Sequence, residues 1–255
     1  MSDAVNAKTF ALASGEYAQF RPRYPDALFD WLAGLAPARD FAWDCGTGNG
    51  QAAEALARRF ARVVANDISA EQIAQAPRPG NIEYLVVPAE EMALPPASVD
   101  VLTVAQAFHW FDLARFYPVA HRALKPGGVI AVIGYSFFNV TAPIDAIFGS
   151  MLLEPIRPYW SQGNAVLRRG YAEVPFPFDP VGAPPLAISC DWTLDRMLSY
   201  IATWSALQRM QRECEAGGAE ALLQRARDAL APLWGEGEQR VTMPLHLRVG
   251  TNRPN

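Results

Sequence analysis

A glycine-rich turn beside an acidic residue is the part of the chain best suited to bind a ligand. Residues 44–50 read Asp-Cys-Gly-Thr-Gly-Asn-Gly, between an apolar stretch at 41–43 and a run of helix formers at 51–60. Glycine tolerates positive φ and has no Cβ, so a ligand can lie against the backbone of such a turn. The helix that follows begins with unpaired N–H groups, and Asp44 adds a carboxylate. The pattern predicts a nucleotide-like ligand at a strand-to-helix turn.

The spacing of the glycines distinguishes between two kinds of nucleotide ligand. Dinucleotide-binding turns carry Gly-x-Gly-x-x-Gly, with a pyrophosphate at the helix N-terminus. Here Gln51 stands where that pattern has its third glycine, and the Asp44 carboxylate would repel a pyrophosphate but suit an ammonium group. The motif resembles the first cofactor-binding motif of class I S-adenosylmethionine (SAM) methyltransferases. For this motif alone, an ordinary tight strand–helix turn remains the alternative.

A second acidic residue follows the next predicted strand, at 62–65. Asp67 comes after the glycine turn by about the spacing at which an acid meets ribose hydroxyls in doubly wound folds. A carboxylate can accept hydrogen bonds from both hydroxyls. The alternative is that Asp67 or Ser69 only caps the helix that begins near Ala70. Both can hold, because Ser69 can cap the helix while Asp67 binds the ribose.

Strands and helices alternate through the first half of the chain. This pattern predicts an α/β fold with a doubly wound, mostly parallel sheet, in which ligands bind at the carboxyl ends of the strands. Beyond Tyr135 the alternation breaks, and a last strand at 239–249 is expected to run antiparallel. The predicted strands are 41–43, 62–65, 82–87, 99–104, 129–135, 188–193 and 239–249, which makes a seven-stranded sheet. The predicted helices are 113–124, 146–153, 194–212 and 219–233, with 125–128 as a helix stop and 175–185 as an irregular loop.

Several further motifs make the resemblance to SAM methyltransferases more specific. Leu-Lys-Pro-Gly-Gly at 124–128 is similar to the turn before their fifth strand, and Ala-Glu-x-x-x-Leu-Pro at 89–95 is similar to their adenine-side loop. Three other segments resemble the small-molecule branch of type 11 methyltransferases that includes the trans-aconitate methyltransferases. These are Gln-Ala-Phe-His-Trp-Phe-Asp at 106–112, Arg-Pro-x-Tyr-Pro at 21–25 and Thr-Trp-Ser-Ala at 203–206. The resemblance implies a Rossmann-like fold with a helical lid, SAM as cofactor and methyl transfer to a small molecule.

The resemblance also implies roles for individual residues. The glycine turn would lie along the methionine part of SAM, Asp67 would bind the ribose, Ile68 would flank the adenine, and Ala105 and Gln106 would line the sulfonium. Cys45 departs from the Val, Ile or Leu expected there, and a buried thiol behaves as a small apolar residue. The implied cofactor-binding residues are Tyr17, Arg21, Asp44, Cys45, Gly46, Thr47, Gly48, Gly50, Asp67, Ile68, Ala89, Glu90, Ala105 and Gln106.

Methyl transfer from a sulfonium mainly requires that the acceptor be positioned and water excluded. An acceptor of high pKa also needs a base, for which His109 is the candidate catalytic residue, whereas an ionised carboxylate needs none. His109 could instead only stack within an aromatic cluster. Candidate residues for an acidic substrate are Arg21, Arg23, Arg157, Arg168 and Arg169, although most are expected to be surface arginines. Candidate substrate-pocket residues are Tyr24, Trp110, Tyr159, Trp160 and Trp204, although such aromatic residues are more often core.

Composition narrows the class of protein. The chain has 255 residues, is 51% hydrophobic and carries a net charge of −4, which gives no reason to expect a nucleic-acid partner. Three scattered cysteines suit reduced thiols in the cytoplasm, and we find no signal peptide, membrane-spanning stretch or zinc spacing. We expect a single domain over 1–255, with a cofactor-covering segment at 1–35 and lid insertions at 137–235. The expected state is a monomer or homodimer without a metal.

Three functions are therefore compared. The first is a SAM-dependent methyltransferase of a small molecule, with a carboxylate as a candidate acceptor. The second is a dinucleotide oxidoreductase, which Gln51 and Asp44 disfavour. The third is a non-catalytic SAM-binding or scaffold protein that retains the fold, against which the intact motifs argue.

Overall fold

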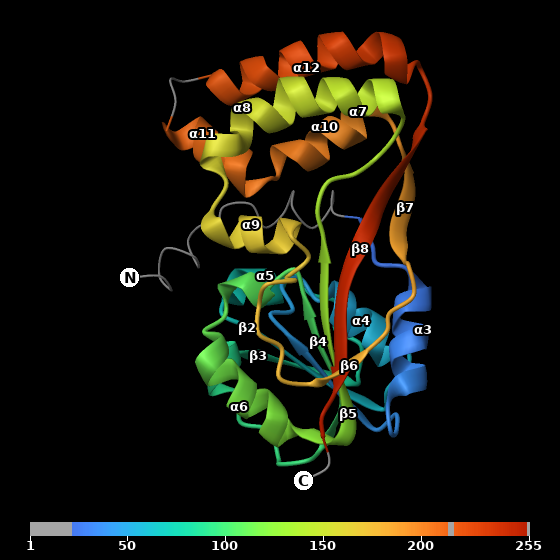
Figure 1. Ribbon diagram of the computed structural model, residues 1–255, viewed down its shortest axis with the longest axis vertical. Coiled ribbons are helices and arrows are strands. Elements are labelled where there is room, and N and C mark those ends of the chain that lie inside the picture. The colour runs from blue at the N-terminus through green and yellow to red at the C-terminus, as the bar shows by residue number, and fades with distance from the viewer. Residues whose placement is uncertain (1–21, 214–216, 254–255) are drawn as a thin grey trace.

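The sheet that carries the site is built from five parallel strands and an antiparallel extension (Figure 1). The computed structural model describes residues 22–213 and 217–253, so Tyr17, Arg21 and Cys214 lie outside the described residues. The strand order is β3-β2-β1-β4-β5-β8-β6, and β7 pairs with the other end of β8. The strands are β1 (Phe41–Cys45), β2 (Arg62–Asp67), β3 (Ile82–Val86), β4 (Val99–Ala105), β5 (Leu124–Tyr135), β6 (Asp179–Val181), β7 (Ala187–Trp192) and β8 (Gln239–Thr251).

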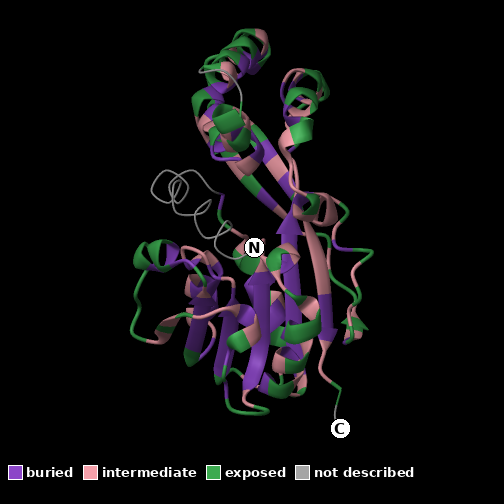
Figure 2. Ribbon diagram, turned by 90° about the vertical axis from the view of Figure 1, so that its left-hand side faces the viewer, coloured by how far each residue is buried: buried purple, intermediate pink, exposed green. Residues whose placement is uncertain are grey.

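The central strands are apolar on both faces because helices cover both faces (Figure 2). On one face, α3 (Asp26–Leu35) and α4 (Gln51–Ala57) pack with side chains such as Ala42 and Val101. On the other, α6 (Leu113–Ala123) packs with side chains such as Trp43 and Leu102. Neighbouring residues of one strand therefore enter different cores, as the period of a strand requires. A short helix, α5 (Ala70–Ala74), follows β2.

A second group of helices forms a layer beyond the carboxyl ends of the parallel strands, and we call it the helical layer (Figure 1). Its core is aromatic and aliphatic and includes Phe148, Trp204, Leu222 and Trp234. It comprises α7 (Ala142–Phe148), the π-helical η3 (Gly149–Leu153), α8 (Glu154–Ile156), η4 (Arg157–Tyr159), α9 (Gln162–Arg168), α10 (Leu194–Ala202), α11 (Ser205–Glu213) and α12 (Gly218–Trp234). None of the described helices combines the length and the apolar character that crossing a bilayer requires.

The mostly parallel α/β sheet is confirmed, but four predicted boundaries are wrong. The sheet has an eighth strand, β6, inside the predicted loop at 175–185, because that segment pairs with β8. The predicted helix 194–212 is two helices, since the Thr203 hydroxyl donates to the carbonyl of Tyr200 at 2.6 Å and the chain turns there. The predicted helix 146–153 begins earlier, at Ala142, with a proline tolerated in its first turn. The predicted fifth strand, 129–135, begins earlier, at Leu124, which pairs with Val99 and follows directly after the end of α6 at Ala123.

Helix α9 packs on β5 at Gly134, where an added side chain would be crowded. A Cβ on the buried Gly134 would lie 2.7 Å from Leu167 Cδ1 and 3.0 Å from a ring carbon of Tyr171. We expect Gly134→Ala to lower the free energy of unfolding by about 1–3 kcal/mol, because the side chains of Leu167 and Tyr171 must shift to make room. Chemical denaturation measures this value. The matched control is Gly34→Ala in α3, where no atom lies within 4 Å of the added Cβ. Equal effects of the two replacements would contradict this account of the packing.

Candidate functional site

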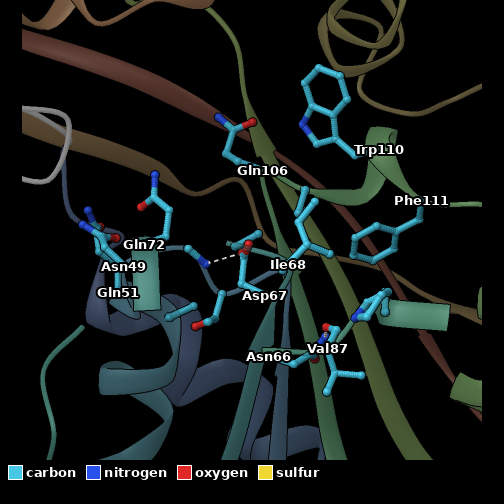
Figure 3. A pocket seen from close by; sticks show the side chains of 18 of the residues that line it. Asn49, Gln51, Asn66, Asp67, Ile68, Gln72, Val87, Gln106, Trp110 and Phe111 are labelled. Atoms are coloured by element: carbon cyan, nitrogen blue, oxygen red, sulfur yellow. Dashed lines mark hydrogen bonds between the residues drawn. The ribbon is translucent and has the colours of Figure 1, made fainter. Parts of the chain in front are cut away.

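A cavity of about 650 Å³ opens at the carboxyl ends of β1, β2, β4 and β5 (Figure 3). This is the edge at which ligands bind in doubly wound sheets. Most of the predicted cofactor residues that the structure describes line it, and so do Tyr24 and Trp110. The lining is Pro22, Tyr24, Gly46, Thr47, Gly48, Asn49, Gln51, Ala52, Asn66, Asp67, Ile68, Gln72, Val86, Val87, Pro88, Ala89, Glu90, Glu91, Ala105, Gln106, Ala107, Trp110, Phe111, Asp112, Arg115 and Tyr135.

The glycine turn is fixed by the neighbouring strand and by close packing. The N–H groups of Gly46 and Thr47 both donate to the carbonyl of Asn66 at 2.9 Å. Gly46 has φ +68°, and a Cβ there would lie 2.5 Å from the Cβ of Ala107. Gly48 has φ +56° but no atom closer than 3.9 Å to such a Cβ, so its backbone faces open space in the cavity. The turn therefore presents bare backbone to a ligand.

Asp67 holds the turn from the side of β2 (Figure 3). One carboxylate oxygen accepts from the N–H of Gly48 at 2.8 Å, and the other accepts from the N–H of Ser69 at 2.9 Å. Burial raises the pKa of Asp67, while these backbone donors oppose the shift. Ser69 caps α5, because its hydroxyl accepts from the N–H of Gln72. The predicted cap is thus confirmed, and ribose binding by Asp67 stays a prediction.

Asp44 lies beneath the lining rather than on it. Its side chain is fully buried, and its two oxygens accept from the hydroxyls of Thr47 and Thr103, each at 2.6 Å. Burial raises the pKa of Asp44 to about 6, against the opposing effect of the two hydroxyl donors. Cys45 and Gly50 are also buried beneath the lining, and burial raises the pKa of the Cys45 thiol. These three residues shape the turn from below.

Three glutamine side chains give the cavity acceptors that the protein leaves unused. The Oε1 atoms of Gln51, Gln72 and Gln106 are buried and have no hydrogen-bond partner among the residues that the structure describes. Gln106 has φ +56°, and its Nε2 donates to the carbonyl of Tyr135 at 2.9 Å, which fixes its amide. An unpaired buried acceptor costs free energy unless a ligand or water supplies a donor. Gln51 and Gln72 were not predicted as binding residues. Gln51 was noted only as the residue in place of the third glycine, and Gln72 is an ordinary helix position in the sequence.

The other end of the cavity is apolar. Ile68 and Val86 are 40% and 54% exposed, which is unusual for large aliphatic side chains in this protein, and Phe111 lies nearby (Figure 3). The Glu90 carboxylate accepts from the N–H of Asp112 at 2.7 Å and so ties the loop after β3 to the segment before α6. This end therefore combines apolar side chains with the acidic side chains of Glu90, Glu91 and Asp112. The described residues include no cluster of side chains that could hold a metal ion.

The remaining predicted residues lie outside the lining. His109 is in η2 (Phe108–Trp110), with its Nδ1 3.1 Å from the hydroxyl of Tyr171, and it packs against Gly163 of α9. The structure thus places His109 between the cavity rim and the helical layer. Tyr159, Trp160 and Trp204 belong to the helical layer and pack with its core cluster.

The burial of Asp44 predicts a pH dependence of stability. Because the pKa of Asp44 is raised in the folded state, stability from this group is highest below its ordinary pKa of 3.8 and falls as the pH rises to about 6. As the pH rises from 4 to 7, the free energy of unfolding of Asp44→Asn should increase relative to that of the unmodified protein, by on the order of 2 kcal/mol. Denaturation at a series of pH values measures the difference. The exposed Asp228→Asn serves as control, and a constant difference at all pH values would refute the assignment.

Comparison with known proteins agrees with this geometry. A family model described as a methyltransferase domain matches residues 43–132. A Dictyostelium discoideum protein that bears the name of a methyltransferase is 32% identical over 200 residues, which cover 77% of this chain and 76% of that protein. A solved structure from Anaeromyxobacter dehalogenans, described as a type II methyltransferase, is 43% identical with a TM-score of 0.86, covering 92% of this chain and all of that one.

A Bacillus halodurans structure described as a methyltransferase has a TM-score of 0.51 at 17% identity and covers 90% of this chain and 99% of its own, which shows the fold alone. The match to the Dictyostelium protein extends well beyond the glycine turn, over three quarters of both chains. The glycine turn, the acid after β2 and the cavity at the strand ends lie where the resemblance predicts them. The chain therefore belongs to the class I SAM-dependent methyltransferases, enzymes whose methyl donor is SAM.

Proposed function

We propose that this methyltransferase binds SAM in the cavity of Figure 3 and methylates a small organic molecule. SAM, when bound, supplies an activated methyl group. The observation that carries the proposal is that one cavity combines a bare glycine turn with three unpartnered amide oxygens. A ligand with an ammonium or sulfonium group would complement these oxygens, whereas a pyrophosphate would not. The residues present therefore fit SAM.

The two ends of the cavity support one orientation of the cofactor. Ile68, Val86 and Phe111 would flank the adenine, and Asp67 would accept from the ribose hydroxyls. The methionine part would then lie along the turn at 46–48, next to Gln51 and Gln72. We infer that these two neutral amides, rather than the buried Asp44 carboxylate, accept from the ammonium group of the methionine. Asp44 would keep the turn in shape through Thr47 and Thr103.

The acceptor would enter from the side of the helical layer. Gln106, Trp110 and Tyr24 line the cavity on that side, and Tyr135 continues from β5 toward the layer. Residues 137–235 would act as a lid that excludes water, although β6 and β7 inside this range belong to the sheet. A net charge of −4 does not favour a nucleic-acid substrate, which supports a small acceptor.

Calorimetric titration with S-adenosylhomocysteine (SAH) tests the cofactor site. We expect micromolar binding of SAH and none of NAD. Asp67→Asn should weaken SAH binding about 10- to 100-fold, because a hydrogen bond to a charged group contributes about 1.5–3 kcal/mol. Binding of NAD, or no effect of Asp67→Asn, would contradict the proposed site.

A second titration uses 5′-methylthioadenosine, which contains the nucleoside of SAH but lacks its amino-acid part. Asp67→Asn should weaken binding of both ligands, since both contain the ribose. Gln72→Leu should weaken binding of SAH alone, because it removes an acceptor for the ammonium group. An equal loss for the two ligands would place Gln72 at the nucleoside instead.

His109 remains the candidate base, and its contact with Tyr171 provides a test. If His109 removes a proton from the acceptor, His109→Ala should lower kcat roughly 100-fold or more while leaving the Kd for SAH unchanged. Turnover is measured with labelled SAM and the acceptor identified by a screen of small carboxylates, phenols and amines. Tyr171→Phe removes only the hydroxyl next to Nδ1 and should shift the pH profile of kcat. A loss of SAH affinity or folding stability with unchanged kcat would assign His109 a structural role.

A further inference from the structure

Arg168, in α9 of the helical layer, has no counter-ion among the residues that the structure describes. Five arginines are candidates for binding an acidic substrate. Three of them form ion pairs within the described residues: Arg23 with Glu54, Arg157 with Glu154 and Arg169 with Glu173. A fourth, Arg21, lies outside the described residues. Arg168 forms no ion pair or hydrogen bond with any residue that the structure describes; its recorded contact is with Trp160. Within the described residues, its charge therefore has no anionic partner.

The surroundings of Arg168 make an uncompensated charge costly. Its guanidinium carbon lies 5.6 Å from the centre of the Trp160 ring, and the side chain is partly buried. Burial lowers the pKa of Arg168, and the neighbouring Arg169 lowers it further. The aromatic face holds the guanidinium in place but does not neutralise it. A bound anion would offset the cost of removing this cation from water.

An aromatic wall connects this arginine to the cofactor cavity. The ring of Trp160 lies 6.1 Å from Phe137 and 5.6 Å from Trp204, and Phe137 and Trp204 are 5.5 Å apart. Phe137 follows β5 by two residues, and Tyr135 at the end of β5 lines the cavity. Phe137 and Trp160 are only partly buried. The partly exposed rings of Phe137 and Trp160 thus lie between the end of β5 and Arg168, and the buried Trp204 packs against both of them.

The turn between α10 and α11 supports this wall, although none of its residues lines the cofactor cavity. In the segment 203–206, Trp204 packs against Trp160, and the Ser205 hydroxyl accepts from Nδ2 of the buried Asn164 at 3.4 Å. Asn164 precedes Arg168 by one helical turn, so both lie on the same face of α9. The other side of α9 meets His109 through Gly163. Helix α9 (Figure 1) therefore joins the arginine and its aromatic wall to the cavity rim.

We propose that Arg168, Trp160 and Phe137, supported by the buried Trp204, form the recognition site for the acceptor, and that the acceptor is an aromatic carboxylic acid. The guanidinium would bind the carboxylate, in the planar two-point geometry that arginine offers. The rings would pack against the flat body of the molecule. A single arginine suits a monoanion better than a phosphate dianion. This inference rests on the proposed function, since it specifies the acceptor of the same methyl transfer.

The test is calorimetric titration of the SAH-loaded enzyme with trans-cinnamate and with uncharged cinnamamide. Cinnamate should bind at least tenfold more tightly than cinnamamide. Arg168→Gln should remove this preference, whereas Arg169→Gln, at the neighbouring residue that pairs with Glu173, should preserve it. Trp160→Leu should weaken binding of both probes. Benzoate and indole-3-acetate, each with its amide, extend the panel to other ring sizes.

The SAH affinity and melting temperature of each variant show whether it is folded. If no acid in the panel binds to the SAH-loaded enzyme, or if acid and amide bind equally, the inference is overturned. An equal effect of Arg169→Gln would also overturn it, and tighter binding of phenyl phosphate would exclude the carboxylate. Failure of the unmodified protein to bind SAH would instead overturn the proposed function, so the two failures are distinguishable.

Discussion

The site depends on the way the end of β1 is tied to the end of β2. The carbonyl of Asn66 accepts from two successive N–H groups of the glycine turn, and the Asp67 carboxylate accepts from a third. Glycine is required because the turn has positive φ and lies against Ala107, which follows β4. Contacts with the ends of β2 and β4 therefore fix the backbone path of the glycine turn that follows β1. The bare backbone, the acid after β2 and the strained Gln106 after β4 face one cavity as a consequence.

The buried side of that turn and the side that faces the cavity carry different kinds of hydrogen-bond acceptor. Below it, Asp44 is enclosed by two threonine hydroxyls and holds its proton more strongly than an exposed carboxyl would. Above it, the cavity lining carries the carboxylates of Asp67, Glu90, Glu91 and Asp112 together with three neutral amides, whose oxygens have no partner among the described residues. Neutral acceptors lose less on removal from water than carboxylates do, so these three amides are less costly to leave without a partner. They also keep their acceptor character at any pH at which the protein is folded.

Periodicity and glycine spacing predicted the parallel sheet and the position of the cavity, because buried parallel strands are continuous apolar runs and their carboxyl ends share one edge. The roles of buried side chains at the site could not be predicted from the sequence. Asp44 has the residue type of a ligand-binding acid, and only tertiary packing buries it. Gln72 is an ordinary helix residue in the sequence, and its orphaned oxygen depends on the fold of the turn beside it. Similarly, only the structure separates Arg168 from the ion-paired arginines near it.

Strand β8 also limits how the enzyme can open. One end pairs with β5 and β6 in the sheet, and the other pairs with β7 beside the helical layer (Figure 1). Hinges in proteins are formed by a few loop or terminal residues, whereas a continuous strand with partners along its length resists bending. The sheet and the helical layer should then move as one stiff body. Product would then leave, and substrate enter, through movement of the loops that flank α9 while the rest of the structure stays rigid.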